Sequence, residues 1–218
     1  MLRVRWVIAI LLLTTGPSQA GIGVTVKGGT LGIGVEGTLG MIPLLNLRGG
    51  LNLLNITRSI SAGDIDYDGD LELKSAHFVA DLHPIPFRGF RLSGGLLYNA
   101  NGLTMTSESI SDSIEVGDQT YQVSDVGNLV GQVDFNTTVP YVGIGWGNAA
   151  ASRFVVAVDL GVMFQGSPEV TSRATGPIST DAAFQQELRQ ETQQLEDDIA
   201  WFKYYPVVSI GFGFKITP

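Results

Sequence analysis

The chain of 218 residues contains no cysteine and only two histidines, His77 and His83. Without cysteine there is no disulfide framework, no thiol nucleophile and no cysteine-ligated metal site. Basic residues are also scarce, because 13 Lys and Arg stand against 21 Asp and Glu, which gives a formal net charge of −8. An acidic chain without a basic cluster does not suit nucleic-acid binding. We therefore expect no nucleic-acid partner.

Long apolar runs are missing too, apart from a short one near the N-terminus. Arg3 and Arg5 precede the apolar residues 6–13, and the small residues Ser18 and Ala20 lie at the −3 and −1 positions of a cleavage site. This is the pattern of a secretory signal peptide, and the run falls short of the roughly 20 residues of a spanning helix. We predict that residues 1–20 are removed and that residues 21–218 form one exported domain. Such a domain is either soluble or crosses a membrane as strands.

Glycine is abundant, with 28 residues, and it occurs in segments where apolar and polar side chains alternate. In residues 153–166, six apolar side chains share one face: Phe154, Val156, Val158, Leu160, Val162 and Phe164. The other face carries polar and small residues, such as Asp159 and Gly161. An unbroken apolar face with aromatic ends is typical of a strand that faces lipid in a membrane barrel. Residues 204–216 repeat this pattern.

The connections between such segments differ in length. Counting alternating segments, we predict eight strands, at residues 22–27, 30–39, 44–56, 66–82, 89–101, 134–147, 153–168 and 203–216. The turns near 40–43, 83–89 and 148–152 are short and fall on the side of the termini. The connections at 102–133 and 171–201 are long and fall on the other side. Outer-membrane barrels show this asymmetry. The fold class is therefore an all-β, eight-stranded antiparallel up-and-down transmembrane β-barrel.

The signal peptide, the Gly-rich strands and the aromatic last strand resemble small outer-membrane barrels of Gram-negative bacteria, of the OmpA, OmpX and OmpW kind. The segments YDGDLELKSAHFVADLHP, VDLGVMFQGSP and FKYYPVVSIGFGF are similar to a proteobacterial barrel family without an assigned activity. The resemblance implies an outer-membrane location. It also implies contact with outer-membrane lipid and lipopolysaccharide, and with the barrel assembly machinery. The chain departs from such barrels in ending on Thr217 and Pro218 rather than on an aromatic residue.

An eight-stranded barrel has an interior that side chains fill. We expect charged residues on the inner face to form ion pairs there, because a lone buried charge is costly. The predicted set is Lys27, Glu36, Arg48, Glu72, Lys74, Arg91, Asp159 and Lys215, with Arg153 near one end. Leu31, Leu71 and Leu73 are predicted to face outward, whereas His77, Val79 and Asp81 are predicted to face inward. A β-bulge near Ser75 and Ala76 would reconcile these two halves of residues 66–82. A filled lumen is favoured over a selective channel.

The stretch GDIDYDGDLELKS, residues 63–75, places an acid at every second position. It matches the start of an EF-hand loop, but position 12, which should be Glu, is Ser75. We place Asp64, Asp66 and Asp68 on a loop at the extracellular rim, next to Asp70. The favoured interpretation is a solvated acidic loop. The alternative is a weak Ca²⁺ or Mg²⁺ site formed by these four carboxylates. No other cofactor is expected.

Residues 181–202 carry helix signals inside the last long connection. Thr180 or Asp181 can cap the helix, and apolar residues from Phe184 to Phe202 follow a helical stripe. We expect this helix to pack over the barrel mouth. A docking surface for an unknown extracellular partner or for lipopolysaccharide is the alternative.

The favoured function is structural or surface-interacting and not enzymatic, with no catalytic residue assigned. One alternative is transport of small or apolar solutes through the lumen or a gap in the wall. Another is a lipid-modifying enzyme using His77 with Ser75, although no strained nucleophile motif marks that serine.

Overall fold

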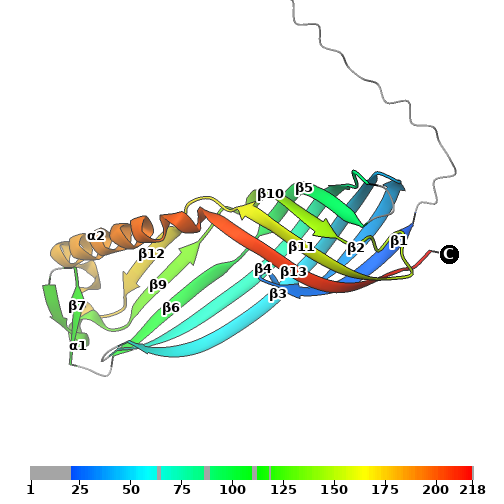
Figure 1. The fold of residues 1–218 in the computed structure, drawn as a ribbon. Coiled ribbons are helices and arrows are strands. Elements are labelled where there is room, and N and C mark those ends of the chain that lie inside the picture. Colours follow the sequence, from blue (N-terminus) through cyan, green and yellow to red (C-terminus); the bar gives the residue numbers. More distant parts are fainter. Residues whose placement is uncertain (1–20, 63–64, 86–88, 110–111, 118, 218) are drawn as a thin grey trace, which may run out of the picture.

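The structure is a computed structural model that describes residues 21–62, 65–85, 89–109, 112–117 and 119–217. Eight strands close into an antiparallel barrel in the ring order β4, β3, β2, β1, β13, β11, β10, β5, and β5 pairs back to β4. They are β1 (Ile22–Gly29), β2 (Gly32–Ile42), β3 (Leu45–Ala62), β4 (Ile65–Leu82), β5 (Phe90–Asn99), β10 (Thr138–Trp146), β11 (Phe154–Phe164) and β13 (Tyr204–Lys215). The predicted barrel and all eight of its strands are confirmed. Both ends of the described chain lie at one end of the barrel (Figure 1).

The barrel wall continues beyond the ring as an open sheet. The C-terminal half of β4 pairs with β5, up to Ser75 opposite Asn99. Its N-terminal half, which extends beyond the ring, pairs with β6 (Gly102–Ser109). β9 (Leu129–Asp134) and β12 (Glu169–Ala174) extend this sheet further. The connection at 102–133 was expected to be a loop but contains β6 and most of β9, whereas the connection at 171–201 contains the end of β12 as well as the expected helix. Their strands have no membrane-length apolar pattern, which is why the sequence showed no spanning strand there.

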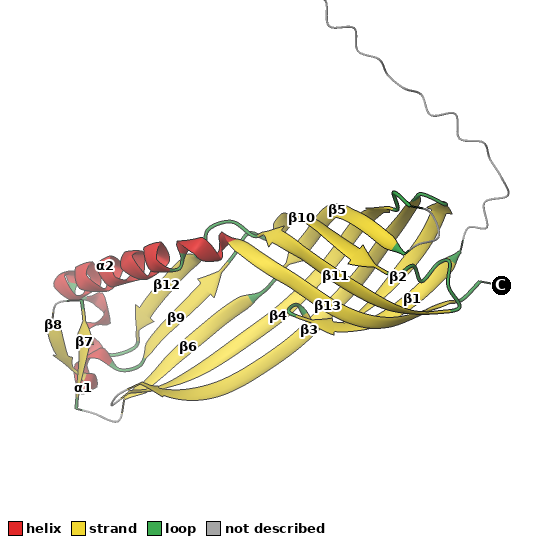
Figure 2. Ribbon diagram, viewed as in Figure 1, coloured by secondary structure: helices red, strands yellow, loops and turns green. Residues whose placement is uncertain are grey.

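A small helical layer covers the far edge of the open sheet, and Figure 2 shows the helices gathered there. It contains α1 (Val123–Val126), the 3₁₀ turns η1 (Pro177–Thr180) and η2 (Ala200–Lys203), and α2 (Ala182–Asp198), beside the hairpin of β7 (Ser113–Val116) and β8 (Gln119–Gln122). Asp181 Oδ1 accepts hydrogen bonds from the N–H groups of Ala183 and Phe184, so the predicted helix and its cap are confirmed. No helix among the described residues is long and apolar enough to cross a bilayer.

Helix α2 does not pack over the barrel mouth as predicted. Its Phe184 and Leu188 are buried in a second apolar core with Ile114, Val116 and Val126. This core lies between α2, α1 and the β7–β8 hairpin, away from the lumen. The sequence could show that the helix had an apolar stripe, but it could not show which surface the stripe would cover.

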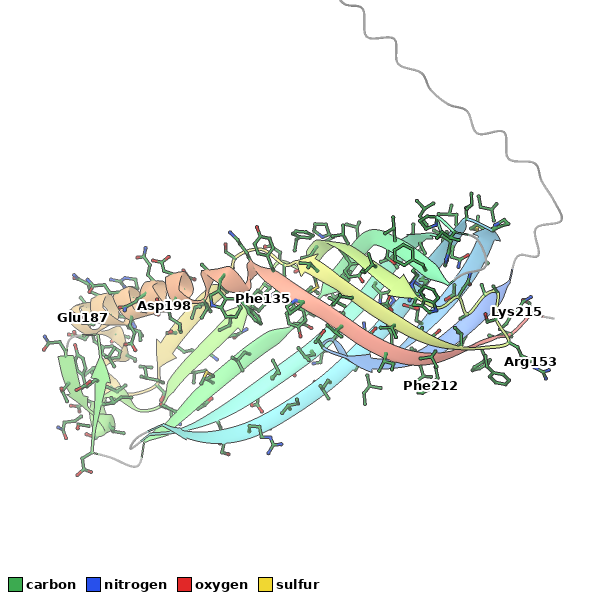
Figure 3. The ribbon with its side chains drawn as sticks, in the orientation of Figure 1. Phe135, Arg153, Glu187, Asp198, Phe212 and Lys215 are labelled. Atoms are coloured by element: carbon green, nitrogen blue, oxygen red, sulfur yellow. The ribbon has the colours of Figure 1, made fainter. Side chains whose placement is uncertain are left out.

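The barrel is apolar outside and polar inside. Phe154 is 79% exposed and Phe212 is 71% exposed, whereas Arg48 and Glu36 in the interior are 4% and 3% exposed. Figure 3 shows Phe212 projecting away from the wall. Outward aromatic residues occur near both barrel ends, because Trp146 lies opposite Phe90 and Phe154 opposite Phe214, while Phe164 lies opposite Tyr204 at the other end. Strand alternation therefore has the polarity expected of a barrel in lipid.

The side-chain assignment along β4 needs a correction. β3 and β4 keep one unbroken register from Leu45 opposite Leu82 to Ala62 opposite Ile65, so the predicted bulge is absent. Leu73 is therefore buried on the same inner face as Ser75, and Lys74 faces outward. Leu31, predicted to face outward, is also buried, because it lies in the β1–β2 turn and closes over the apolar part of the lumen.

Candidate functional site: the filled lumen

Arg48 on β3 forms the centre of a buried ionic layer. Its Nε donates to Asp81 Oδ2 at 2.5 Å and its Nη2 donates to Asp81 Oδ1 at 3.0 Å. Nη1 donates to both carboxylate oxygens of Glu36, at 3.1 and 3.0 Å. Longer contacts of 3.3 and 3.4 Å reach Asp159 from across the barrel. One guanidinium thus joins carboxylates from β2, β4 and β11, which a planar five-donor group can do.

Glu36 has two further partners. Lys27 Nζ donates to Glu36 Oε2 at 2.8 Å, and His77 Nε2 donates to the same oxygen at 2.7 Å. On the other side of the imidazole, Asn52 Nδ2 lies 3.5 Å from His77 Nδ1 and donates to Ser75 Oγ at 3.1 Å. His77 and Ser75 therefore share the inner face of β4, with Asn52 between them.

Arg91 on β5 completes the layer. Its Nη2 donates to Asp159 Oδ1 at 2.8 Å, and its Nη1 donates to the carbonyl of Gly147. Three cations (Lys27, Arg48 and Arg91) meet three carboxylates (Glu36, Asp81 and Asp159), so the formal charges of this layer cancel. Such matching is what makes six ionised groups tolerable inside a narrow barrel.

An apolar layer lies above the ionic one. It consists of Leu31, Val79, Leu97, Val139, Tyr141, Met163 and Val207, with Tyr205 packed against them. Met163 is fully buried. Between the two layers is a cavity of about 20 Å³, which Lys27, His77 and Tyr141 help to line. A cavity needs roughly 10–15 Å³ of such volume to hold one water, so this one has space for a single molecule.

Three glycines make room for the rings of two lumen side chains, His77 and Tyr141. A Cβ atom built on Gly50 would lie 2.6 Å from the ring of His77. Cβ atoms on Gly143 and Gly161 would both meet the hydroxyl oxygen of Tyr141, the second of them at 2.6 Å. Each of these Cβ atoms would also lie within 3.0 Å of a backbone oxygen, of Val35, Leu160 and Val142 respectively, so a larger residue does not fit without a backbone shift. The high glycine content of the strands follows in part from the side chains that fill the barrel.

His83 lies at the end of the barrel that bears the termini, just beyond β4. Its Nδ1 donates to the carbonyl of Phe90 at 3.1 Å, and its Nε2 accepts from Asn46 Nδ2 at 3.0 Å, which together define a neutral tautomer. Burial lowers the pKa of His83 below its ordinary value. The imidazole is thus a structural hydrogen-bonding group of the turn.

The structure brings together five of the eight predicted lumen charges: Lys27, Glu36, Arg48, Arg91 and Asp159. Glu72 and Lys74 face outward instead and pair with each other at 2.8 Å, both about half exposed. Lys215 is half-buried at the barrel end, and Arg153 is exposed there (Figure 3). Neither forms an ion pair with a described acidic residue.

Asp81 was placed on the inner face from the sequence but was missing from the predicted ion-pair set, although it is 1% exposed and binds Arg48. The sequence pattern could have identified this ion pair, because Asp81 lies four residues after His77 and therefore on the same face of the strand. The assumed bulge divided β4 into two halves with different facing, and this drew attention to Glu72 and Lys74 instead.

The acidic stretch is a strand rather than a rim loop from Ile65 onward. Asp68 lies opposite Ser59 and Thr106, and Asp70 lies opposite Thr57 and Thr104. Asp64 lies outside the described residues, as does the side chain of Asp66. Among the described side chains no three acids or histidines are arranged to hold a metal ion. The four-carboxylate Ca²⁺ or Mg²⁺ site stays a prediction.

Comparisons with known proteins support the fold. Crystal structures of CarO2 and CarO from Acinetobacter baumannii have TM-scores of 0.59 and 0.57, with 21% and 20% identity. The matches cover 90% and 88% of this chain, and 98% and 96% of those chains. A major outer membrane protein from Thermus thermophilus has 12% identity and a TM-score of 0.45, covering 91% of this chain and 100% of that one. No protein-family model matches, and neither does any curated protein sequence. The likeness to the two Acinetobacter structures establishes a shared eight-stranded barrel fold.

Proposed function

We propose that this chain is an integral outer-membrane barrel whose lumen is closed and whose outer sheet carries surface interactions. The observation that supports the proposal most is the pair of layers inside the barrel. A charge-neutral layer around Arg48 and an apolar layer around Met163 lie one above the other, separated only by a water-sized cavity. A path for a hydrated solute would have to break both layers.

The outward surface supports a membrane location. Exposed apolar side chains cover all eight ring strands, and on β13 they occur at every second residue from Val208 to Phe214. A water-soluble protein would not leave so continuous a band exposed. The narrower resemblance to OmpA, OmpX and OmpW proteins, and contact with the assembly machinery, belong to the same proposal.

The test is single-channel recording of the folded protein in a planar bilayer, with a 16-stranded porin as the positive control. The proposal expects no resolved conductance steps at salt concentrations where the porin conducts. Steady steps from the wild-type chain would contradict a closed lumen and would favour the transport alternative.

The enzymatic alternative has its own test. His77 is held by Glu36, and Ser75 Oγ accepts a hydrogen bond from Asn52, so both side chains belong to the buried network. We expect His77→Gln to leave the lipid A composition of the host unchanged. A change in lipid A that depends on His77 would contradict the structural role.

A further inference from the structure

One margin of the outer sheet has no neighbouring strand among the described residues. The pairing of β3 with β2 ends at Leu53 opposite Ile33, whereas its pairing with β4 continues to Ala62 opposite Ile65. Residues 54–62 therefore have β4 on one side and no described strand on the other. In Figure 1 this part of β3 forms the lower margin of the outer sheet. We call it the free edge.

The backbone of the free edge directs hydrogen-bonding groups away from the sheet. The carbonyl oxygen of Leu53 lies on the β2 side of the strand, 2.7 Å from a Cβ atom built on Gly32. The direction of these groups alternates with period two along an antiparallel strand, so Asn55, Thr57 and Ser59 direct their N–H and C=O groups to the same side. The free edge can therefore accept another strand without losing any of its pairing to β4.

The opposite margin of the same sheet is protected. That margin is β12, and α2 packs beside it. The N–H of Val170 on β12 donates to Glu196 Oε1 of α2 at 2.8 Å. Proteins commonly protect exposed strand edges by covering them, or with proline and β-bulges. The free edge contains no proline, and its register with β4 has no bulge. A long unprotected edge is the kind that strand addition uses.

A row of acids lies beside the free edge, on the outward face of β4. Asp68 and Asp70 lie opposite Ser59 and Thr57 of β3, and opposite threonines of β6 on the other side. Neither carboxylate forms an ion pair with another described residue. Neighbouring carboxylates repel unless a cation lies among them. A partner at this margin should therefore bring positive charge.

The strand spacing shows how a partner would meet these acids. Neighbouring strands are about 4.8 Å apart, so a strand added to β3 lies about 10 Å from β4. The outward side chains of β3 between them are short, so Lys or Arg at every second position of the added strand can reach Asp68 and Asp70. On the inward face the added strand meets Leu54 and Ile56, and Ile56 is 37% exposed. Apolar residues suit the alternate positions there.

A second copy of this chain does not fit the free edge. Two barrels in one membrane point the same way, so their β3 strands run in the same sense and cannot pair antiparallel. Strands of membrane barrels tilt by about 40°. A rotation about the membrane normal that brings two free edges together therefore makes the strands cross instead of lying side by side. The occupant has to be a segment of another molecule.

We propose that the free edge binds an extended cationic peptide segment as an added antiparallel strand. Basic residues at every second position of this segment lie on the outward face beside the carboxylates of β4, and apolar residues lie between them on the inward face. Main-chain hydrogen bonds supply the affinity, and the alternation supplies the specificity. The inference deepens the surface-interaction role proposed above and rests on the outer sheet lying outside the bilayer. It does not require the lumen to be closed.

Binding is measured with a defined peptide and the protein in phosphatidylcholine nanodiscs, which carry no net charge. The probe is a fluorescent peptide of alternating Lys and Val, about eight residues long, within the usual length of a strand. We expect saturable binding by anisotropy. We also expect NMR to show slower hydrogen exchange at the amides of Asn55, Thr57 and Ser59, because these groups become hydrogen-bonded. A peptide of alternating Glu and Val should bind at least about tenfold more weakly.

Methylated peptides separate strand pairing from attraction between charges. In an antiparallel pair, residues that exchange hydrogen bonds have their side chains on the same face, so the lysines direct their N–H groups to β3. N-methylation of the lysines should weaken binding about tenfold or more, whereas N-methylation of the valines should leave it nearly unchanged. Both peptides keep the full charge. They also need no change in the protein.

Matched variants locate the site on the protein. Thr57→Pro removes a donor that points to the free edge, and proline is compatible with an edge strand whose N–H faces solvent. Binding should fall about tenfold, whereas Thr57→Val keeps the N–H and should bind like the wild-type chain. Asp68→Asn with Asp70→Asn should also weaken binding about tenfold. Asp197→Asn with Asp198→Asn makes the same charge change on α2, beside the opposite margin, and should have little effect. Circular dichroism checks that each variant is folded.

The proposal is overturned if the Lys–Val peptide does not bind at concentrations up to about 1 mM. It is also overturned if methylation of the lysines leaves the affinity unchanged, because binding is then attraction to an acidic surface only. Equal binding of the Glu–Val peptide, or full binding to the folded Asp68 and Asp70 double variant, would refute a cationic partner. Channel recordings do not bear on these outcomes, so a conducting lumen and an unoccupied free edge are separate results.

Discussion

At the scale of single residues, burial separates two ion pairs that otherwise look alike. Lys27 and Lys74 each hold a glutamate at 2.8 Å, but Lys27 and Glu36 are 11% and 3% exposed, whereas Lys74 and Glu72 are 44% and 50% exposed. Removing one member of a buried pair leaves an uncompensated charge, whereas an exposed pair is screened by water.

We therefore predict that Lys27→Met destabilises the folded barrel by about 3 kcal/mol, near the low end for buried pairs because Arg48 still neutralises Glu36. Lys74→Met should change the free energy of unfolding by less than about 1 kcal/mol. Urea unfolding in lipid vesicles measures both. Equal effects of the two substitutions would contradict the assignment of Lys27 to the inside and Lys74 to the outside.

His83 gives a prediction about pH. Its folded pKa is lowered by burial, so the unfolded chain binds the proton more readily, and stability rises with pH across the window between the lowered folded pKa and the unfolded value of about 6.5. The contribution is fully present above that window and is lost as pH falls through the folded pKa. His83→Gln should flatten this dependence as pH falls below the unfolded value, as measured by urea midpoints at each pH. An unchanged slope in the variant would refute it.

At the scale of strands, the inner glycines should be irreplaceable while an outer one is not. A Cβ on Gly161 would lie 2.6 Å from Tyr141, whereas a Cβ on Gly28 meets nothing within 4 Å. We predict that Gly161→Val costs about 1–3 kcal/mol or blocks folding, because it overpacks the lumen. Gly28→Val should fold like the wild-type chain. The yield of folded barrel in detergent compares the two, and a tolerated Gly161→Val would mean that Tyr141 does not fill this space.

The outer helical layer should unfold without the barrel. Phe184 is 1% exposed in the second core, and Leu195 on the same helix is 44% exposed. Phe184→Ala should destabilise this layer by about 3–5 kcal/mol, whereas Leu195→Ala should have little effect. The loss of stability is measured by comparing amide hydrogen exchange in α2 with that in β11. Loss of protection in β11 as well would show that the two cores are one cooperative unit.

Much of the barrel could be predicted from the local sequence pattern, and the errors of that prediction have a physical cause. Alternation with period two identifies a strand and its two faces, as in 153–166 and 204–216. It cannot show which neighbour a strand pairs with. β4 changes partners from β5 to β6 at its midpoint without any shift in register, and the sequence suggested a bulge there because Leu71 and Leu73 are apolar. Leu73 is instead buried on the inner face, and Leu71, two residues before it, lies on the same face of the strand.

An open pocket in the wall, lined by residues of β4, β5, β6 and β9 and the links between them, was beyond prediction for a related reason. Tyr98, Asn101, Glu72 and Asp134 come from different strands or links and meet only because β6 and β9 extend the wall. Pairing across the barrel has to be known before such a cluster can be recognised.

At the scale of the whole molecule, the protein is inverted relative to a water-soluble one. The apolar side chains of the ring strands point away from the centre, and the charges meet inside around Arg48. Above the ring, the sheet opens, and a second apolar core under α2 has the ordinary polarity of a soluble domain. One chain therefore combines a barrel with the polarity of a membrane protein and an outer region with the polarity of a soluble domain.

The most direct test of this inversion uses the absence of cysteine. Single cysteines along β13, at residues 207–212, can carry spin labels in the protein reconstituted into lipid vesicles, and accessibility to oxygen and to a water-soluble nickel complex is then measured. We predict that Val208, Ile210 and Phe212 report high oxygen accessibility and exclusion of nickel, alternating with low oxygen accessibility at Val207, Ser209 and Gly211. Nickel accessibility at Ile210, or no alternation along the strand, would contradict the account.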